Sequence, residues 1–425
     1  MVKDLLEIVS QFIFFLGIVF TLLFLYKVFY IFVAFKARRD HSQEEKEVPL
    51  NKYAFLIPAR NEELVIGQLI QSIKNQNYPK ELYDIYVCAD NCTDQTAKIA
   101  RQAGAIVTER FNKEVVGKGY ALNHLLNIIK RDYSSKSYDG YFVFDADNLL
   151  DENYIQEMNK TFNQGYRVTT SYRNSKNYDE NWITSGYALW FLYEAEFLNR
   201  PRMYLKTSCA VSGTGFLIHS DVIKENGGWV HHLLTEDIEF TVAQIIKGEK
   251  IGYCGKAVFY DEQPSIFSES WKQRLRWAKG FYQVFMRYGK DLMNGIIRGK
   301  GNRVSCFDMM MTLAPIIIVS VLSLAGNIVV LLLALLEGEG LFNEYVFRGA
   351  GGILSIYVFL FSFGLITTTM EWNKIRCSNW KKIFYMFTFP LFMFTYLPIS
   401  LVALFKKIEW KPIQHTVVKS IDDLR

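Results

Sequence analysis

The stretch YAFLIPARNEELVIGQLIQSIKNQNYPKELYDIYVCAD, residues 53–90, decides the fold of this chain. It opens with a short apolar run at 53–59, continues with a helical pattern at 64–76 and closes with a second apolar run at 83–90. A strand, a helix and a strand in this order predict two parallel strands joined by a crossover helix. The stretch therefore favours an α/β fold.

The same alternation continues downstream. Apolar runs recur at 105–110 and 140–147, and helical patterns occupy 96–104 and 120–130. Strands that alternate with helices in this way build a mainly parallel sheet with helices on both faces. We therefore predict an α/β domain over residues 50–265.

Polar clusters follow three of these strands directly. They read ARNEE at 59–63, DNCTDQT at 90–96 and DADN at 145–148. In open α/β sheets, ligands bind beyond the carboxyl ends of the strands. The sequence therefore predicts a binding site along this edge of the sheet.

Composition indicates a membrane protein and excludes one class of partner. Half of the 425 residues are hydrophobic and 16% are aromatic, which exceeds what an ordinary soluble core requires. The net charge of +5 is small, and the cations gather beside apolar segments instead of forming a dense stripe, so no nucleic acid partner is expected. The six scattered cysteines include no C-x-x-C pair, which argues against a zinc site or disulfide framework and for a reducing compartment.

An apolar segment near the start of the chain, residues 12–35, is long enough to span a bilayer. A signal peptide would have a shorter apolar core and a cleavage site of small residues. KARR follows at 36–39, so the positive-inside rule places the next residues in the cytoplasm and residues 1–10 outside. We predict an N-terminal transmembrane helix within 1–36 and a multi-pass protein of the cell membrane.

Three further apolar segments, at 309–336, 351–370 and 383–405, follow the α/β domain. The last contains Pro390 and Pro398, so it either crosses the bilayer completely or is broken and re-entrant. We therefore predict that the part of the chain after the α/β domain consists of interface helices at 266–305, three membrane segments within 306–406 and a tail at 407–425.

The motif VFDADN, residues 143–148, places Asp145 and Asp147 two positions apart at the end of a strand. Two carboxylates this close repel each other unless a cation lies between them. Their hard oxygen atoms favour Mg²⁺ or Mn²⁺, held jointly with a diphosphate. The alternative is a turn in which an aspartate caps the next helix.

The motif HLLTEDIEF, residues 232–240, places Glu236 and Asp237 directly after Thr235. A carboxylate here could act as a general base on an acceptor hydroxyl. The alternative is an ordinary capping box at the start of a helix.

Two glycine-containing motifs could approach a ligand closely. GKGYAL, residues 117–122, places Lys118 between glycines at a predicted helix start, which could seat an anion; the alternative is a flexible loop. VSGTGFLI, residues 211–218, contains Gly213 and Thr214 and is either a tight turn between strands or a close approach of backbone to ligand.

The motif QRLRWAKG, residues 273–280, lies between the α/β domain and the membrane segments. One interpretation is a membrane-surface helix whose Arg274 and Lys279 face lipid phosphates. In the other, Arg276 binds a departing diphosphate and Trp277 stacks on a sugar, with Gln273 on the same helical face.

The order of these motifs is more specific than any one of them. ARNEE, ADNCTD, GKGYAL, D-x-D, T-E-D and Q-x-x-R-W before membrane helices resembles the processive family-2 glycosyltransferases, which include hyaluronan, chitin, cellulose and poly-N-acetylglucosamine synthases. The resemblance covers residues from about 50 to 280. It implies a nucleotide-sugar-binding domain of the GT-A type, a UDP-sugar donor, Mg²⁺ or Mn²⁺, and inversion to a β-linked product.

The resemblance also implies roles for particular residues. The catalytic residues would be Asp237 as general base and Glu236 as its support, and Asp147 would ligate the metal. The donor would contact Glu62, Asp90, Lys118, Asp145 and Arg276. The acceptor would contact Gln273, Trp277, Gly213 and Thr214. The chain departs from the family at Ala89, where many members have a second aspartate, and this puts the identity of the nucleotide in doubt.

Three functions remain open from the sequence. The first is a polysaccharide synthase that uses UDP-glucose or UDP-N-acetylglucosamine and exports its product. A regulatory or export partner chain could act with it. The second is a glycosyltransferase that adds one sugar to a membrane lipid. The third is a catalytically inactive membrane scaffold, against which the intact D-x-D, T-E-D and Q-x-x-R-W argue.

Overall fold

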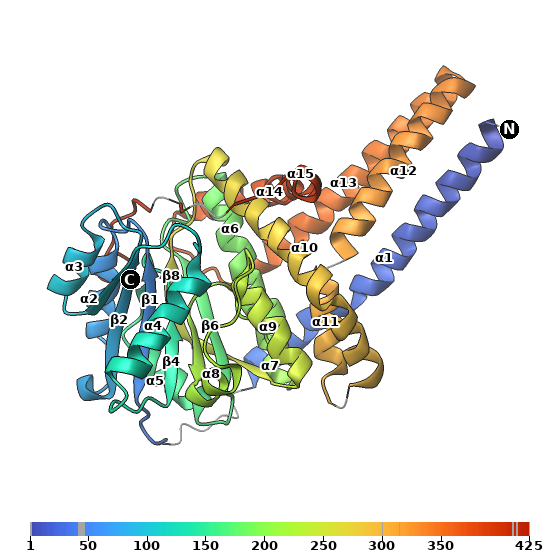
Figure 1. Cartoon of the computed structure of the whole chain (residues 1–425). Helices are drawn as coiled ribbons and strands as arrows, with labels where there is room; N and C mark the ends of the chain where they lie inside the picture. The colour runs from blue at the N-terminus through green and yellow to red at the C-terminus, as the bar shows by residue number, and fades with distance from the viewer. Residues whose placement is uncertain are drawn as a thin grey trace.

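The computed structural model describes residues 2–40, 47–299, 301–313, 315–409, 412–413 and 415–424, and no side chains within 315–321 (Figure 1). A twisted sheet with flanking helices forms one part of the molecule, and long helices extend from it. The outermost of these are α1 (Val2–Arg39), α12 (Pro315–Glu337) and α13 (Glu339–Met370), which lie side by side.

The first half of the sheet is parallel, as the sequence predicts. Strands β1 (Tyr53–Ala59), β2 (Tyr83–Asp90), β3 (Ile106–Arg110) and β4 (Gly140–Val143) pair in the order β3-β2-β1-β4. The strand predicted to reach residue 147 ends at Val143, because a turn closed by the Asn148 N–H donating to the Asp145 carbonyl follows it.

The second half of the sheet is mixed. Its strands are β5 (Leu149–Leu150), β6 (Val168–Ser175), β7 (Phe216–His219) and β8 (Ile251–Asp261). Strand β7 runs antiparallel between β4 and β6, whereas β6 and β8 are parallel to each other. Parallel pairs therefore predominate in the eight-stranded sheet.

Helices cover both faces of the sheet, so both faces of its strands are apolar. On β1, Phe55 and Ile57 pack against α2 (Ile66–Lys74), α3 (Thr96–Gln102) and α5 (Tyr154–Phe162), while Ala54 and Leu56 face α4 (Lys118–Asp132). The remaining elements of this part are α6 (Trp182–Tyr193), a π-helical turn (Glu194–Asn199), α7 (Arg200–Tyr204), α8 (Ser220–Asn226) and α9 (Glu236–Lys247).

Three helical segments are long and apolar enough to cross a membrane within the described residues: 2–39, 339–370 and 379–405. The predicted segment at 309–336 includes residue 314, which lies outside the described residues; around it the chain forms α11 (Arg303–Leu313) and α12, with a shorter apolar helix at 322–337. At about 1.5 Å per residue, the 38 residues of α1 exceed the thickness of a bilayer core.

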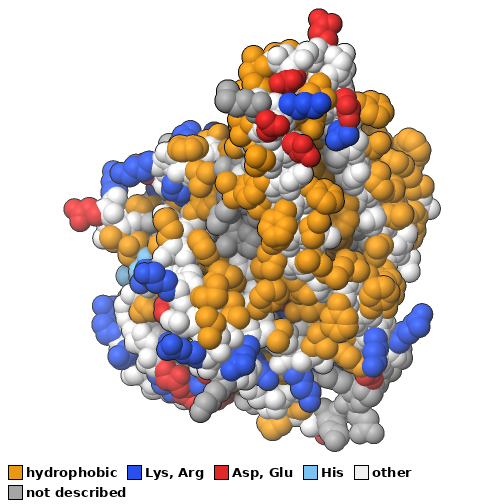
Figure 2. Space-filling view, turned by 90° about the vertical axis from the view of Figure 1, so that its right-hand side faces the viewer, with side chains coloured by type: hydrophobic (Ala, Val, Ile, Leu, Met, Phe, Trp, Pro, Cys, Tyr) orange, Lys and Arg blue, Asp and Glu red, His pale blue; other side chains and the backbone are white. Residues whose placement is uncertain are grey.

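The surface of these helices is strongly apolar. Phe14 of α1 and Phe347 of α13 are 72% and 81% exposed, together with many leucine, isoleucine and phenylalanine side chains nearby. Figure 2 shows a broad orange face with Lys and Arg below it and charged side chains at the tip above it. An apolar face of this extent, bounded by charge, indicates contact with a membrane.

The last apolar segment contains a break between two helices, and residues 379–405 together remain long and apolar enough to cross a membrane. Helix α14 (Asn379–Phe394) contains Pro390, and α15 (Tyr396–Phe405) begins after Thr395. At the break, the Phe392 carbonyl accepts hydrogen bonds from Thr395 Oγ1 (2.6 Å) and Arg274 Nη1 (3.3 Å). The same carbonyl also accepts the Thr395 backbone N–H at 3.2 Å, so backbone and side-chain donors both meet at the break.

A buried ion pair ties the long helices to the α/β domain. Arg202 of α7 donates to Asp308 of α11 through Nε (2.7 Å) and Nη2 (3.0 Å), and both side chains are 2% exposed. Tyr26 and Tyr30 of α1 donate to the same carboxylate at 2.9 and 3.0 Å. One carboxylate therefore joins α1, α7 and α11.

Replacing Asp308 by alanine is expected to destabilise the protein by about 3–5 kcal/mol, because it leaves the Arg202 guanidinium buried without a counter-charge. Thermal unfolding of the detergent-purified protein measures the effect. The double variant Arg202→Met with Asp308→Leu should regain most of the loss; a single variant as stable as wild type would contradict this account.

Candidate active site

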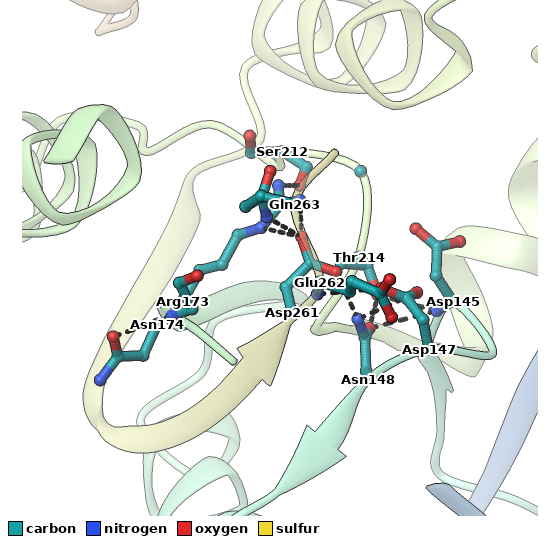
Figure 3. A network of polar contacts seen from close by, with 12 residues as sticks. Asp145, Asp147, Asn148, Arg173, Asn174, Ser212, Thr214, Asp261, Glu262 and Gln263 are labelled. Carbon is teal, nitrogen blue, oxygen red and sulfur yellow. Dashed lines mark hydrogen bonds and ion pairs between the residues drawn. The ribbon is translucent and has the colours of Figure 1, made fainter. Parts of the chain in front are cut away.

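The two aspartates of the D-x-D motif point to different partners. Asp147 is 2% exposed and its Oδ2 accepts a hydrogen bond from the Glu262 backbone N–H at 3.1 Å. The Asp145 carboxylate points away from this network (Figure 3) and forms an ion pair with Lys118. Neither aspartate caps a helix, since the strand β5 follows and α5 begins after Asn153, so the capping alternative is wrong.

Lys118 connects the D-x-D turn to the glycine turn before β7. Its Nζ also donates to the Gly213 carbonyl at 2.8 Å. Burial alone would lower the pKa of Lys118, but the carboxylates of Asp145 and Glu236 raise it. The lysine is therefore a fixed cation at the start of α4. Thr214 Oγ1, next to Gly213, accepts the Asp145 backbone N–H at 2.9 Å.

Close packing requires glycine at position 119 of the GKGYAL motif. A Cβ atom on Gly119 would lie 2.2 Å from the His231 carbonyl oxygen, so no larger residue fits there. The flexible-loop alternative is wrong for Lys118 and Gly119, which form the first turn of α4.

Glu236 and Asp237 open helix α9 beside this cation. The side chain of Thr235 makes no capping hydrogen bond, so the capping-box alternative is wrong. Burial and the neighbouring Asp237 raise the pKa of Glu236 to about 7, although Lys118 opposes the shift. Burial also raises the pKa of Asp237, against backbone N–H groups that include Gly213. Burial thus raises the pKa of both carboxyl groups, and that of Glu236 lies near neutral pH.

The Q-x-x-R-W motif lies on the 32-residue helix α10 (Phe267–Arg298). Burial lowers the pKa of Arg276, while the carboxylates of Glu236, Asp145 and Asp237 raise it, so this guanidinium lies near the acidic site. Among the described residues, its Nε and the Oε1 of Gln273 have no hydrogen-bond partner although both are buried. Buried polar atoms without a partner require an explanation, and a ligand or an ordered water bound beside them would supply one.

Trp277 packs among aromatic rings of α6. Its ring centroid lies 5.7 Å from Tyr187 and 6.3 Å from Phe191, both edge-on. The membrane-surface interpretation is wrong for Arg274, which is fully buried against the break between α14 and α15, with Thr395 Oγ1 at 2.5 Å. Lys279 donates to the Ala403 carbonyl at 3.0 Å. Helix α10 therefore presents one face to the site and another to the membrane segments.

The residues predicted to contact the nucleotide follow β1 and β2. Asp90 is 4% exposed and accepts from Arg110 Nη1 at 2.5 Å and from Asn91 Nδ2 at 3.0 Å. Glu62 lies beside His415 of the C-terminal tail, which approaches both of its oxygens at 3.0 Å. Burial raises the pKa of Glu62 to about 7, although His415 opposes the shift.

Sequence reasoning missed the residues that follow β8. Asp261 accepts from Asn148 Nδ2 at 2.8 Å and from Gln263 Nε2 at 2.7 Å, and it forms an ion pair with Arg173 (Figure 3). Burial and Asp147 raise the pKa of Asp261 to about 6, although Arg173 opposes them. The signal was present, since DEQ at 261–263 is a polar cluster directly after an apolar strand.

A divalent cation would be held at Asp147. Within the described residues, no three His, Cys, Asp or Glu side chains form a complete metal cage. The carboxylate oxygens of Asp147 fit Mg²⁺ or Mn²⁺, because these cations take oxygen ligands and complete their coordination with water and substrate phosphates. The buried carboxylate of Asp147 would supply negative charge to such a cation, whereas Asp261 is paired with Arg173.

An α/β sheet of this order, with a D-x-D turn and an acidic site at its carboxyl edge, defines the GT-A class of fold. The family description "Glycosyltransferase like family 2" matches residues 49–280, more than half of the chain, and the chain therefore belongs to that family. Among solved structures, it resembles the mannosyltransferase PcManGT from Pyrobaculum calidifontis in complex with GDP-Man and Mn²⁺. The TM-score is 0.57 at 13% identity, over 95% of this chain and 99% of that one.

Two curated relatives differ in their products. The beta-monoglucosyldiacylglycerol synthase of Nostoc sp. is 26% identical over 65% of this chain and 58% of its own length. The poly-beta-1,6-N-acetyl-D-glucosamine synthase of Staphylococcus epidermidis is 22% identical over 61% of this chain and 62% of its own length. The chain thus spans less than two thirds of the relatives it matches.

Proposed function

We propose that this protein is a membrane-embedded inverting glycosyltransferase that adds sugar from a UDP-sugar to the end of a growing β-linked polysaccharide and exports the product. The observation that supports this most directly is a cluster of charged side chains from four motifs that are far apart in the sequence. These side chains are Lys118, Asp145, Glu236, Asp237 and Arg276. The cluster places a candidate base beside two cations.

The geometry supports a direct displacement. Asp237 accepts the proton of the acceptor hydroxyl as that oxygen attacks the anomeric carbon. Arg276 and Lys118 stabilise the negative charge that develops on the departing diphosphate. Attack from the side opposite the leaving group inverts the anomeric carbon. When bound at Asp147, Mg²⁺ or Mn²⁺ would neutralise part of the diphosphate charge, and the mannosyltransferase complex makes Mn²⁺ the first cation to test.

The orientation proposed for the membrane follows from the end of α1. Lys36, Arg38 and Arg39 lie in its last turn, next to the α/β domain, and Arg38 pairs with Glu371 at 2.8 Å. The positive-inside rule then places the site in the cytoplasm, in a multi-pass protein of the cell membrane.

A glycolipid product is the second candidate, and one structural feature favours it. A groove of about 410 Å³ opens between α6 and α14. Its lining is mostly apolar and comprises Asn181, Trp182, Phe384, Tyr385, Thr388 and Leu391. A lipid chain would fit such a lining, and the relative from Nostoc is named as the synthase of a glycolipid.

The experiment that tests the proposal measures UDP release by the detergent-purified protein with Mg²⁺ or Mn²⁺. UDP-glucose is tested first and UDP-N-acetylglucosamine second, within a panel of UDP-sugars. A polymer that a specific glycosidase digests would support the synthase. A small lipid-soluble product would support the glycolipid-forming enzyme instead. No UDP release with any donor would contradict both functions.

The acid limb of the pH profile of kcat/KM is expected above the ordinary carboxylate range, because burial raises the pKa of the base Asp237 and the neighbouring Glu236 has a pKa raised to about 7. A base must be unprotonated, so activity should fall as the pH is lowered through the raised pKa of Asp237. In Glu236→Gln the limb should move to lower pH, since one neighbouring carboxylate is gone. A wild-type limb near the ordinary carboxylate pKa, about 4, would contradict the assignment.

Replacing Trp277 by alanine is expected to slow chain extension about tenfold more than UDP-sugar hydrolysis, because the ring would bind the acceptor and not the donor. Product length and UDP release, measured in the same reaction, separate the two effects. Trp380→Ala is the matched control, since this tryptophan is 71% exposed on α14. Equal losses in extension and hydrolysis would count against an acceptor role.

A further inference from the structure

A short segment directly before Glu236 contacts the three helices that carry the predicted site residues. Residues 231–235, which we call the clasp, lead into α9. Lys118 lies on α4, Asp237 on α9 and Arg276 on α10, and α9 and α10 lie side by side (Figure 1). The contacts of the clasp with these helices therefore bear on how the three side chains are placed.

One buried carboxylate holds the clasp through its backbone. Glu239 of α9 is 0% exposed, and its Oε2 accepts the N–H groups of His232 and Leu233 at 2.9 and 3.0 Å. Its Oε1 accepts the Tyr288 hydroxyl of α10 at 3.1 Å and forms an ion pair with Arg287 at 3.2 Å. These four groups are all donors, so the carboxylate joins the clasp to α10.

The clasp lies along one face of α10. Five residues of this helix follow one another at alternate steps of three and four, so they share a face. They are Gln273, Arg276, Gly280, Gln283 and Arg287. A Cβ atom on Gly280 would lie 2.5 Å from the Thr235 side chain, and Gln283 Oε1 accepts the Leu234 N–H at 3.4 Å. The face that carries Arg276 therefore continues into the contact with the clasp.

The clasp also packs against the start of α4. The His231 carbonyl oxygen would lie 2.2 Å from a Cβ atom on Gly119, so the backbone of the clasp fits only against a glycine there. The His232 imidazole stacks on the Tyr120 ring, with the ring centroids 4.1 Å apart and the planes within 4° of parallel. Gly119 and Tyr120 directly follow Lys118. The clasp therefore contacts the helical turn that carries the lysine.

We propose that Glu239 is a positioning residue that, through the clasp, fixes the predicted base Asp237 relative to the cations Lys118 and Arg276. The inference rests on the proposed function, because it takes these three side chains as the groups that act on the acceptor and the leaving group. Glu239 and Asp237 share the first turn of α9. Glu239 is fully buried, so it acts through these side chains and not on a substrate. A displacement of about 1 Å in such a group lowers the rate about 10²-fold.

The test compares Glu239→Ala with wild type, using the full-length detergent-purified protein. The change releases the clasp from α10, so kcat for UDP release should fall about 10²-fold. The Kd for UDP with Mn²⁺ and the KM for the UDP-sugar should stay within about twofold of wild type, because ground-state binding is not altered. Glu239→Gln should recover part of kcat, since its carbonyl oxygen can still accept the two N–H groups of the clasp.

Tyr288→Phe tests the same link with a smaller change. It removes one hydroxyl from the Glu239 carboxylate and should lower kcat about fivefold, the effect of one hydrogen bond, again with an unchanged Kd for UDP. Tyr83→Phe is the matched control, because the Tyr83 hydroxyl donates to the Ile73 carbonyl at 3.0 Å and Tyr83 lies at the amino end of β2, away from the site. It should lose similar stability in thermal unfolding but keep the wild-type kcat.

Hydrogen exchange of the clasp provides a readout that does not depend on turnover. The His232 and Leu233 amides should be protected in wild type and in Glu239→Gln, and they should exchange faster in Glu239→Ala. A wild-type kcat in Tyr288→Phe, or in folded Glu239→Ala, would overturn the inference. A loss of UDP binding equal to the loss of kcat would overturn it too, because it would show a general disruption of the site. If wild type releases no UDP from any UDP-sugar, the proposed function fails and the inference fails with it.

Discussion

Replacing Asp237 by asparagine is expected to lower kcat about 10³-fold while the Kd for UDP stays near that of wild type. The change removes the base beside Gly213 and Lys118 but leaves the shape of the site and its cations in place. Turnover is measured as UDP release, and binding is measured by calorimetry on the same preparation.

Asp291→Asn is the control for this substitution. Asp291 is exposed on α10, so its replacement removes the same charge at a place away from the site. If Asp237→Asn kept the wild-type kcat, the base would have to be another group. If it lost UDP binding as well, Asp237 would belong to the donor site instead.

Replacing Arg276 by alanine is expected to reduce kcat about 10²–10³-fold, the effect of removing one group that stabilises developing charge. The guanidinium lies near Glu236, Asp145 and Asp237. The other cations of the motif are held elsewhere, since Arg274 is buried against α14 and Lys279 donates to the Ala403 carbonyl. Arg276→Lys should recover only part of the activity, because an ammonium cannot bind two phosphate oxygens side by side.

Lys272→Ala is the matched control, since this exposed cation lies four residues earlier on the same helix. The loss in Arg276→Ala should appear in kcat more than in KM for the UDP-sugar. An effect confined to KM would show that Arg276 binds the ground state and does not act on the leaving group.

Much of the α/β domain could be predicted because its signals are local. The strands at 53–59, 83–90 and 105–110 are short apolar runs bounded by polar clusters, and the structure confirms them within one residue. The same reasoning, applied to KAVFYDEQ, would have found β8 and the carboxylates after it. The roles of the site residues stay predictions, since they depend on ligands.

Other features could not be predicted because they are set by distant parts of the chain. Whether Thr235 caps α9 depends on its packing against Gly280 of α10. Glu62 and His415 are 353 positions apart, and nothing in the local sequence of either indicates the other. The burial of Arg274 depends on its contacts with Phe392 and Thr395 at the break after α14, which the prolines suggest but do not locate.

The two faces of α10 have a mechanical consequence. Arg276 and Arg274 are two residues apart on one rigid helix, and the first faces the carboxylates while the second is fixed to the joint between α14 and α15. A tilt of α14 in a thinner or thicker bilayer would therefore be expected to shift the guanidinium. For the proposed glycosyltransferase, the turnover rate should then vary with lipid chain length in reconstituted vesicles, so that the thickness of the surrounding membrane would set its rate.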